Sequence, residues 1–163
     1  MTPTILFVDD HNLEQSITAE LSLKHKLNKK GLLNDISVGS AGLKPTEGST
    51  SKYLNRALRQ HFWKEIDTSA YVHHEPQVIS SDQLYGNTLI LSFTGVQQAI
   101  LLNKDRNLNS YMLPEFIDKG MEDVPAAADR ITTFKNYDLM RLFPGMLKKA
   151  YRKHDKVDFR ETF

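Results

Sequence analysis

The chain has 163 residues, of which 40% are hydrophobic and 25% charged, a composition typical of a folded protein with a single domain over residues 1–163. Its formal net charge of +1 gives no strong field for nucleic acid or an anionic membrane surface, and neither is expected as a partner. The absence of cysteine excludes disulfides, thiolate metal sites and thiol catalysis. No segment has the pattern of a transmembrane helix or a secretory signal, so we expect a cytoplasmic location.

Strand-like and helix-like patterns alternate along the chain. In chain order they predict a strand at 4–8, a helix at 15–29, a strand at 36–41, a helix from Ser49 or Thr50 to about Glu65, a strand at 88–93, a helix at 95–102, a short strand at 111–113 and helical segments from about Ala127. Residues 42–48 and 72–84 are expected to be loops.

Alternation of this kind predicts an α/β protein with three layers, in which helices flank a four-stranded parallel sheet. Ligands of such sheets bind at the carboxyl ends of the strands. The segment directly after the first predicted strand lies at one of these ends, which makes it the first candidate for a functional site.

That segment has the length and setting of an anion-binding loop, since it joins a strand to the start of a helix. Its residues are Asp9, Asp10, His11, Asn12, Leu13, Glu14, Gln15 and Ser16. The loop therefore carries three acidic residues and no Lys or Arg. Two like charges ~4 Å apart near a surface repel by roughly 4 kcal/mol, so a phosphate dianion would be disfavoured here. We interpret Asp9 as a carboxylate that stabilises the fold by accepting the loop's own amide hydrogens.

The chain resembles the low-molecular-weight protein tyrosine phosphatases and, more loosely, the arsenate reductases. Val8, Asn12, Ser16 and Ala19-Glu20 fall in register with that family's Val-Cys-x-Gly-Asn-x-Cys-Arg-Ser loop and the helix after it. The remaining matches follow in the same order as in the family. They are Ser40-Ala41-Gly42 after the second strand, the third strand at 88–93, and Asp123-Val124-Pro125, which corresponds to the approach to the Asp-Pro loop.

The resemblance implies a phosphatase fold whose reactive groups are replaced. In the family a cysteine attacks phosphorus, an arginine binds the phosphoryl oxygens and an aspartic acid protonates the leaving group. The corresponding residues here are Asp9, Gln15 and Ala126, and the acid loop reads Pro125, Ala126 and Ala127. We therefore expect a catalytically inactive member, a pseudophosphatase, with no phosphate ligand and no cofactor, and in particular no hydrolysis of aryl phosphates.

Two alternatives remain open at this point. In the first, Asp9 and Asp10 hold a divalent metal, or Asp9 acts as a nucleophile, in an enzyme of changed chemistry. The second is a receiver-like signalling domain, because a strand that ends in Asp-Asp is found there too. A receiver also needs an aspartate at the end of its third strand, and the strand at 88–93 ends without one.

The expected function is binding or regulation through a protein partner, with no metal site. The interface predicted for that partner is the face of the loop, with the acidic residues Asp10, Glu14, Glu122 and Asp123, so the partner surface is expected to be basic. A second possible contact is Trp63. The pair His73-His74 is interpreted as loop histidines and not as metal ligands.

Overall fold

The computed structural model describes residues 2–45 and 74–116. Its elements, in chain order, are β1 (Thr4–Asp9), α1 (Gln15–Lys29), β2 (Ser37–Gly42), α4 (Ser81–Leu84), β3 (Thr88–Ser92), α5 (Gly95–Lys104), β4 (Ser110–Met112) and α6 (Leu113–Phe116). None of the described helices is long and apolar enough to cross a lipid bilayer.

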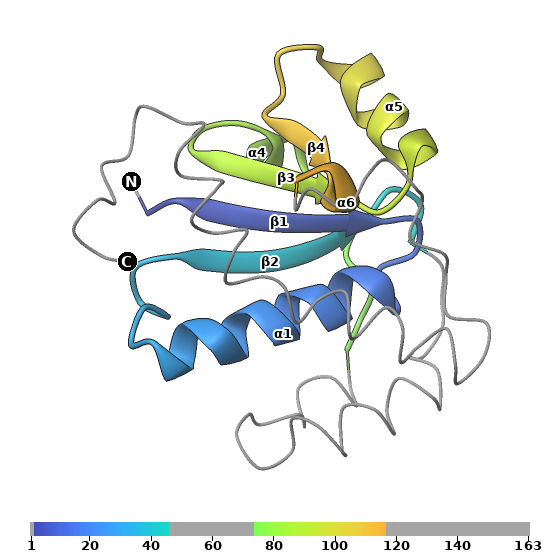
Figure 1. The fold of residues 1–163 in the computed structure, drawn as a ribbon. Helices are drawn as coiled ribbons and strands as arrows, with labels where there is room; N and C mark the ends of the chain where they lie inside the picture. Colours follow the sequence, from blue (N-terminus) through green and yellow to red (C-terminus); the bar gives the residue numbers. More distant parts are fainter. Residues whose placement is uncertain (1, 46–73, 117–163) are drawn as a thin grey trace.

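The described strands form one parallel sheet in the order β2-β1-β3-β4 (Figure 1). Val8 of β1 pairs with Ala41 of β2 on one side and with Ser92 of β3 on the other. The carboxyl ends of these three strands therefore lie next to one another at one edge of the sheet. The amino ends of α1 and α5 start from the same edge, as βα units on a parallel sheet require.

The strand β1 has no polar residue between Thr4 and Asp9, because both of its faces are buried. Ile5 and Phe7 pack on the face covered by α1, whereas Leu6 and Val8 pack on the face covered by α5. Alternate residues of a strand point to opposite faces, so one apolar run supplies both cores. Figure 1 shows α1 along one face of the sheet and α5 on the other, which gives the three layers.

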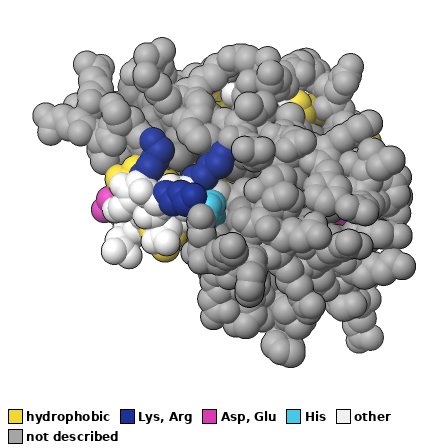
Figure 2. Space-filling view, turned by 60° about the horizontal axis from the view of Figure 1, so that its bottom comes forward, with side chains coloured by type: hydrophobic (Ala, Val, Ile, Leu, Met, Phe, Trp, Pro, Cys, Tyr) yellow, Lys and Arg dark blue, Asp and Glu magenta, His cyan; other side chains and the backbone are white. Residues whose placement is uncertain are grey.

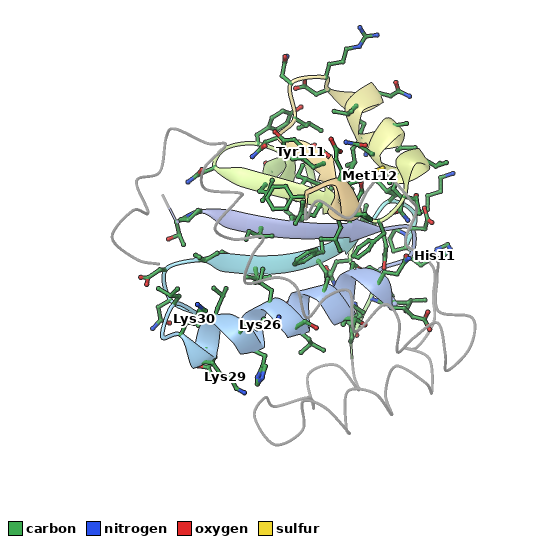
Figure 3. All side chains as sticks on the ribbon, in the orientation of Figure 1. His11, Lys26, Lys29, Lys30, Tyr111 and Met112 are labelled. Atoms are coloured by element: carbon green, nitrogen blue, oxygen red, sulfur yellow. The ribbon has the colours of Figure 1, made fainter. Side chains whose placement is uncertain are left out.

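The long helix α1 buries Ala19, Leu23 and Leu27 in the core cluster on one face of the sheet. Its C-terminal end carries lysine side chains, and Figure 3 labels Lys26, Lys29 and Lys30 there. In the turned view of Figure 2, dark-blue side chains gather on the surface where this helix ends. Positive charge at this end complements the partial negative charge of the helix C-terminus.

The fold predicted from the pattern is confirmed, with small shifts of boundary. The helix at 15–29 has the predicted bounds, β2 and β4 are each displaced by one residue, and α5 runs to Lys104 instead of residue 102. The prediction of a continuous loop over 72–84 is wrong at Ser81–Leu84, where a short helix is closed by a capping box between Ser80 and Gln83. The helices predicted at 49–65 and from 127 onward lie outside the described residues.

Candidate functional site

The loop after β1 is organised around the buried side chain of Asp9, which is only 4% exposed. Its Oδ1 accepts a hydrogen bond from the backbone N–H of Asn12 at 2.5 Å, and its Oδ2 accepts one from the backbone N–H of Ser16 at 2.9 Å. Glu14, the residue before α1, makes no side-chain hydrogen bond to the first turn of the helix. The carboxylate of Asp9, seven positions before Ser16, accepts the backbone N–H of Ser16 in its place. This is the geometry expected of a carboxylate that stands where a loop of this kind would hold an external anion.

The pKa of Asp9 is shifted by two opposing effects. Burial raises this pKa above its ordinary value of 3.8, while the backbone N–H groups of Ser16 and Asn12 lower it. The nearby charge of Asp10 adds to the rise. The loss of hydration outweighs the hydrogen bonds, so the net direction is upward. Ionisation of Asp9 is therefore harder in the folded protein than in the unfolded chain.

This upward shift predicts a pH dependence of stability. The folded state binds the Asp9 proton more tightly than the unfolded state, so the free energy of unfolding should fall as the pH rises from about 3.8 through the raised pKa. The Asp9→Asn variant has no titrating group at this position, so its free energy of unfolding should not show this pH-dependent decrease. Urea unfolding of both proteins over a pH series measures the effect. A wild-type stability that rose relative to Asp9→Asn over this range would contradict the assignment.

Asn12 is the second organising residue of the loop. It is fully buried and has a left-handed backbone with φ of 56°, which asparagine adopts more readily than most residues. Its Nδ2 donates to Ser16 Oγ at 3.0 Å and to Ser40 Oγ at 2.9 Å. Its Oδ1 accepts from the backbone N–H of Gln77 at 2.9 Å. One side chain therefore joins the loop, α1, β2 and the segment before α4.

The hydrogen bonds of Asn12 continue to the surface of α1. Ser40 Oγ donates to Glu20 Oε2 at 2.6 Å, and Glu20 forms an ion pair with Lys24 one helical turn further on. Ser40 is 9% exposed, so its hydroxyl needs partners inside the protein. The Ala19-Glu20 and Ser40-Ala41-Gly42 motifs noted in the sequence thus meet at one hydrogen bond.

Residues 74–79 cover the loop on the side of β2. His74 Nε2 lies 2.9 Å from the backbone oxygen of Asn12 and 3.0 Å from its Oδ1. Gly42 forms an isolated parallel bridge with Val78. A Cβ at Gly42 would lie 3.0–3.1 Å from backbone atoms of Asp10, His11 and Asn12, so only glycine lets the loop come this close. His74 is a loop histidine, as interpreted from the sequence; His73 lies outside the described residues.

The second acidic residue, Asp10, is exposed but held in place. Its Oδ2 accepts a hydrogen bond from Gln97 Nε2 at 3.1 Å. Gln97 is 1% exposed, and its Oε1 accepts from the backbone N–H groups of Phe93 at 2.9 Å and Thr94 at 3.1 Å. Gln97 thus joins the amino end of α5 to the loop after β1.

The other residues of the loop differ in their exposure. His11 is exposed beyond the end of β1 (Figure 3), and its Nδ1 lies 3.0 Å from the backbone oxygen of Lys44. Leu13 and Glu14 are half-buried, and Gln15, in the position where the family has arginine, is buried. Several predicted site residues lie outside the described residues: Trp63, Glu122, Asp123, Pro125, Ala126 and Ala127.

The alternative of a metal-dependent site has no preformed ligand set in the described ranges. Within residues 2–45 and 74–116, no three His, Asp or Glu side chains come together as metal ligands. The two oxygens of Asp9 are each taken by a backbone N–H. Binding of a divalent ion by Asp9 and Asp10 stays an untested alternative, which a magnesium titration can test.

Gln97 and Gln77 were not among the residues singled out from the sequence. A signal existed for one of them, because Thr94-Gly95-Val96-Gln97 has the Thr-x-x-Gln pattern of a capping box, and both hydrogen bonds of that box are present. The contact of Gln97 with Asp10 spans 87 positions and has no local signal.

Comparison with known proteins gives structural matches only, since no protein-family model and no curated protein sequence matches the chain. A low-molecular-weight protein tyrosine phosphatase from T. tengcongensis has a TM-score of 0.73 and 22% identity, covering 93% of this chain and 99% of its own. A protein tyrosine phosphatase from Entamoeba histolytica has a TM-score of 0.77 and 14% identity, covering 96% and 99%. The YwlE arginine phosphatase from Geobacillus stearothermophilus has a TM-score of 0.72 and 20% identity, covering 95% and 99%.

These similarities correct one expectation drawn from the sequence. The expectation that the chain is not an enzyme is contradicted by this finding, because the proteins named above, which share its fold, are protein tyrosine phosphatases and an arginine phosphatase. What the residues themselves establish is narrower: without cysteine, any phosphoryl transfer by this chain needs a nucleophile other than a thiolate. The matches also favour the phosphatase fold over the receiver-like alternative. The chain has the fold of the low-molecular-weight protein tyrosine phosphatases.

Proposed function

We propose that this chain is a regulatory protein that binds a protein partner through the face around the loop at 9–16, and that Asp9 takes the place of the anion in that loop. The observation that carries the proposal is the position of the Asp9 carboxylate, whose two oxygens accept the N–H groups of Asn12 and Ser16. A phosphate group would need those same donors, and Gln15 supplies no positive charge in place of the family's arginine.

Charge on the same face supports a partner of opposite sign. Asp10 is exposed and Glu14 half-exposed, both at the carboxyl edge of the sheet where α/β proteins present their binding loops. A basic partner would associate more slowly and less tightly as salt rises, because exposed charges are screened beyond about 10 Å at 0.1 M salt. Glu122 and Asp123, which the sequence adds to this interface, lie outside the described residues.

An anion titration tests whether Asp9 fills the loop. We expect phosphate and vanadate to leave the thermal midpoint of the wild-type protein unchanged, because the loop donors are already satisfied. Asp9→Ala frees those donors, so both anions should raise its midpoint by a few degrees, corresponding to about 1.4 kcal/mol at ten times the dissociation constant.

Asp9→Asn is the matched control, because its side-chain oxygen remains in the loop and should keep the anions out. Phosphate binding by the wild-type protein in isothermal titration calorimetry, abolished by Asp9→Asn, would contradict the proposal. Magnesium is titrated on the same samples. Its binding to the wild-type protein, lost in Asp10→Asn, would favour instead an enzyme of changed chemistry with a divalent ion at Asp9 and Asp10.

A further inference from the structure

The helix α1 has opposite charges at its two ends. Asp10, in the loop before the helix, is exposed and Glu14 is half-exposed, and the loop at 9–16 contains no Lys or Arg. The segment at 24–35, where the helix ends, contains four lysines and one acidic residue. We call Asp10 and Glu14 the acidic end of the molecule.

The positive charge at the other end of α1 lies on the surface. Lys29 and Lys30 are exposed and Lys26 is half-exposed. Figure 3 shows these three lysines on the C-terminal half of α1 and His11 of the loop beyond the opposite end of the helix. Leu33, just past the helix, is an apolar side chain that is 41% exposed. We call Lys26, Lys29, Lys30 and Leu33 the basic end.

The two ends are too far apart to neutralise each other within one molecule. The helix α1 has 15 residues, so at about 1.5 Å per residue its first and last residues lie roughly 21 Å apart. Exposed charges are screened beyond about 10 Å at 0.1 M salt. The charges of one end can therefore meet the opposite end only on another molecule.

The helix dipole favours charges of these signs at the ends of α1, but it does not account for the whole arrangement. Asp10 lies outside the helix, and the buried Gln97 donates from Nε2 to its Oδ2 at 3.1 Å. Leu33 is uncharged and gains nothing from the dipole. Val78, 62% exposed, adds an apolar side chain near the acidic end, because it is bridged to Gly42, which lies against the backbone of Asp10. Exposed apolar side chains favour contact with another surface.

We propose that the acidic end of one molecule binds the basic end of a second copy, so that the chain associates head to tail. This inference rests on the function proposed above, because it identifies the basic partner with the chain itself. The contact joins two different surfaces, so each molecule in a pair keeps one unused end and the assembly can grow beyond a dimer. Exposed ion pairs contribute little individually, so we expect the association to be weak and to need low salt.

Sedimentation velocity of the full chain over a series of protein concentrations tests the association. At low salt we expect the average mass to rise with concentration from the 18.7 kDa of one chain to about twice that value or more. At about 1 M salt, where charges are screened beyond about 3 Å, the mass should return to that of one chain. A mass that stays at one chain at low salt, or a rise that salt does not reverse, would overturn the inference.

Charge-reversal variants test which surfaces make the contact. The double variant Lys29→Glu with Lys30→Glu, and separately Asp10→Lys with Glu14→Lys, should each stay at the mass of one chain. An equimolar mixture of the two variants should associate again, because the first keeps an intact acidic end and the second an intact basic end. Circular dichroism checks that both variants are folded. A mixture that does not associate would contradict the head-to-tail contact.

The matched control is Lys104→Glu with Arg106→Glu, which changes the net charge by the same amount. Both residues are exposed, and they lie at the end of α5, on the other face of the sheet from α1. This variant should associate like the wild-type protein, and an equal loss of association in it would overturn the inference.

The phosphate titration on the same samples separates this inference from the proposed function. If the wild-type chain does not associate and phosphate does not bind, the second copy is the wrong partner and the proposed function is unaffected. Phosphate binding by the wild-type loop would contradict the proposed function itself.

Discussion

Asn12→Ala is expected to lower the free energy of unfolding by about 3 kcal/mol, the largest effect of any single substitution in the loop. The backbone N–H of Gln77 and the hydroxyls of Ser16 and Ser40 would each lose a partner inside the protein. Alanine would also have to adopt the left-handed backbone that asparagine tolerates. Urea denaturation monitored by circular dichroism measures the change.

Asn12→Gly separates the two causes, because glycine adopts the left-handed backbone without strain but makes no side-chain hydrogen bond. The glycine variant should recover about 1 kcal/mol of the loss and no more. Equal stability of Asn12→Gly and the wild-type protein would mean that the hydrogen bonds of Asn12 contribute nothing. A double-mutant cycle with Ser40→Ala then isolates the hydrogen bond between these two residues.

Asp9→Ala should destabilise the protein by about 1–3 kcal/mol at neutral pH, because the N–H groups of Asn12 and Ser16 would be left without an acceptor. Burial of the charge reduces this effect, since part of what the hydrogen bonds contribute is offset by the lost hydration of the carboxylate. The measurement is again the denaturant midpoint. An unchanged slope of the free energy of unfolding against denaturant concentration would show that the folded and unfolded states keep their compactness.

Asp9→Asn should cost less than Asp9→Ala, because the amide oxygen still accepts one of the two N–H groups and no charge is buried. The pH dependence described above should make the difference between Asp9→Asn and the wild-type protein smaller as the pH rises. An unchanged midpoint in Asp9→Ala would contradict the buried position of the carboxylate and place it in solvent.

The sequence predicted the fold well because its signals are local. The run from Ile5 to Val8 is apolar at every position, as a strand buried on both faces requires. The helical spacing of α1 predicted its bounds, residues 15–29, without error. The hypothesis that Asp9 accepts the loop's amide hydrogens came from charge alone and agrees with the hydrogen bonds to Asn12 and Ser16.

Contacts between distant segments could not be predicted in this way. The hydrogen bonds of Gln97 with Asp10 and of Gln77 with Asn12 span 87 and 65 positions. The capping-box pattern of Thr94 and Gln97 indicates only the local role of Gln97, and Gln77 has no local signal. The short helices α4 and α6 were missed because four residues give too little periodicity for a pattern to register. The cytoplasmic location and the protein partner stay predictions.

The anionic group in the loop at 9–16 is a side chain of the protein itself, Asp9, and this affects how the loop responds to its surroundings. The occupancy of a loop that binds free phosphate rises with the phosphate concentration until the site is saturated, and the stability of the loop varies with that concentration. Here the anionic group is part of the chain, and a tethered group has an effective concentration set by the backbone and not by the medium. If Asp9 takes the place of the anion as proposed, we expect the closed loop, and any partner surface built on it, to be independent of the phosphate level around the protein. The proton on Asp9 is then an external variable to which the loop responds, because burial raises the pKa of this carboxyl group.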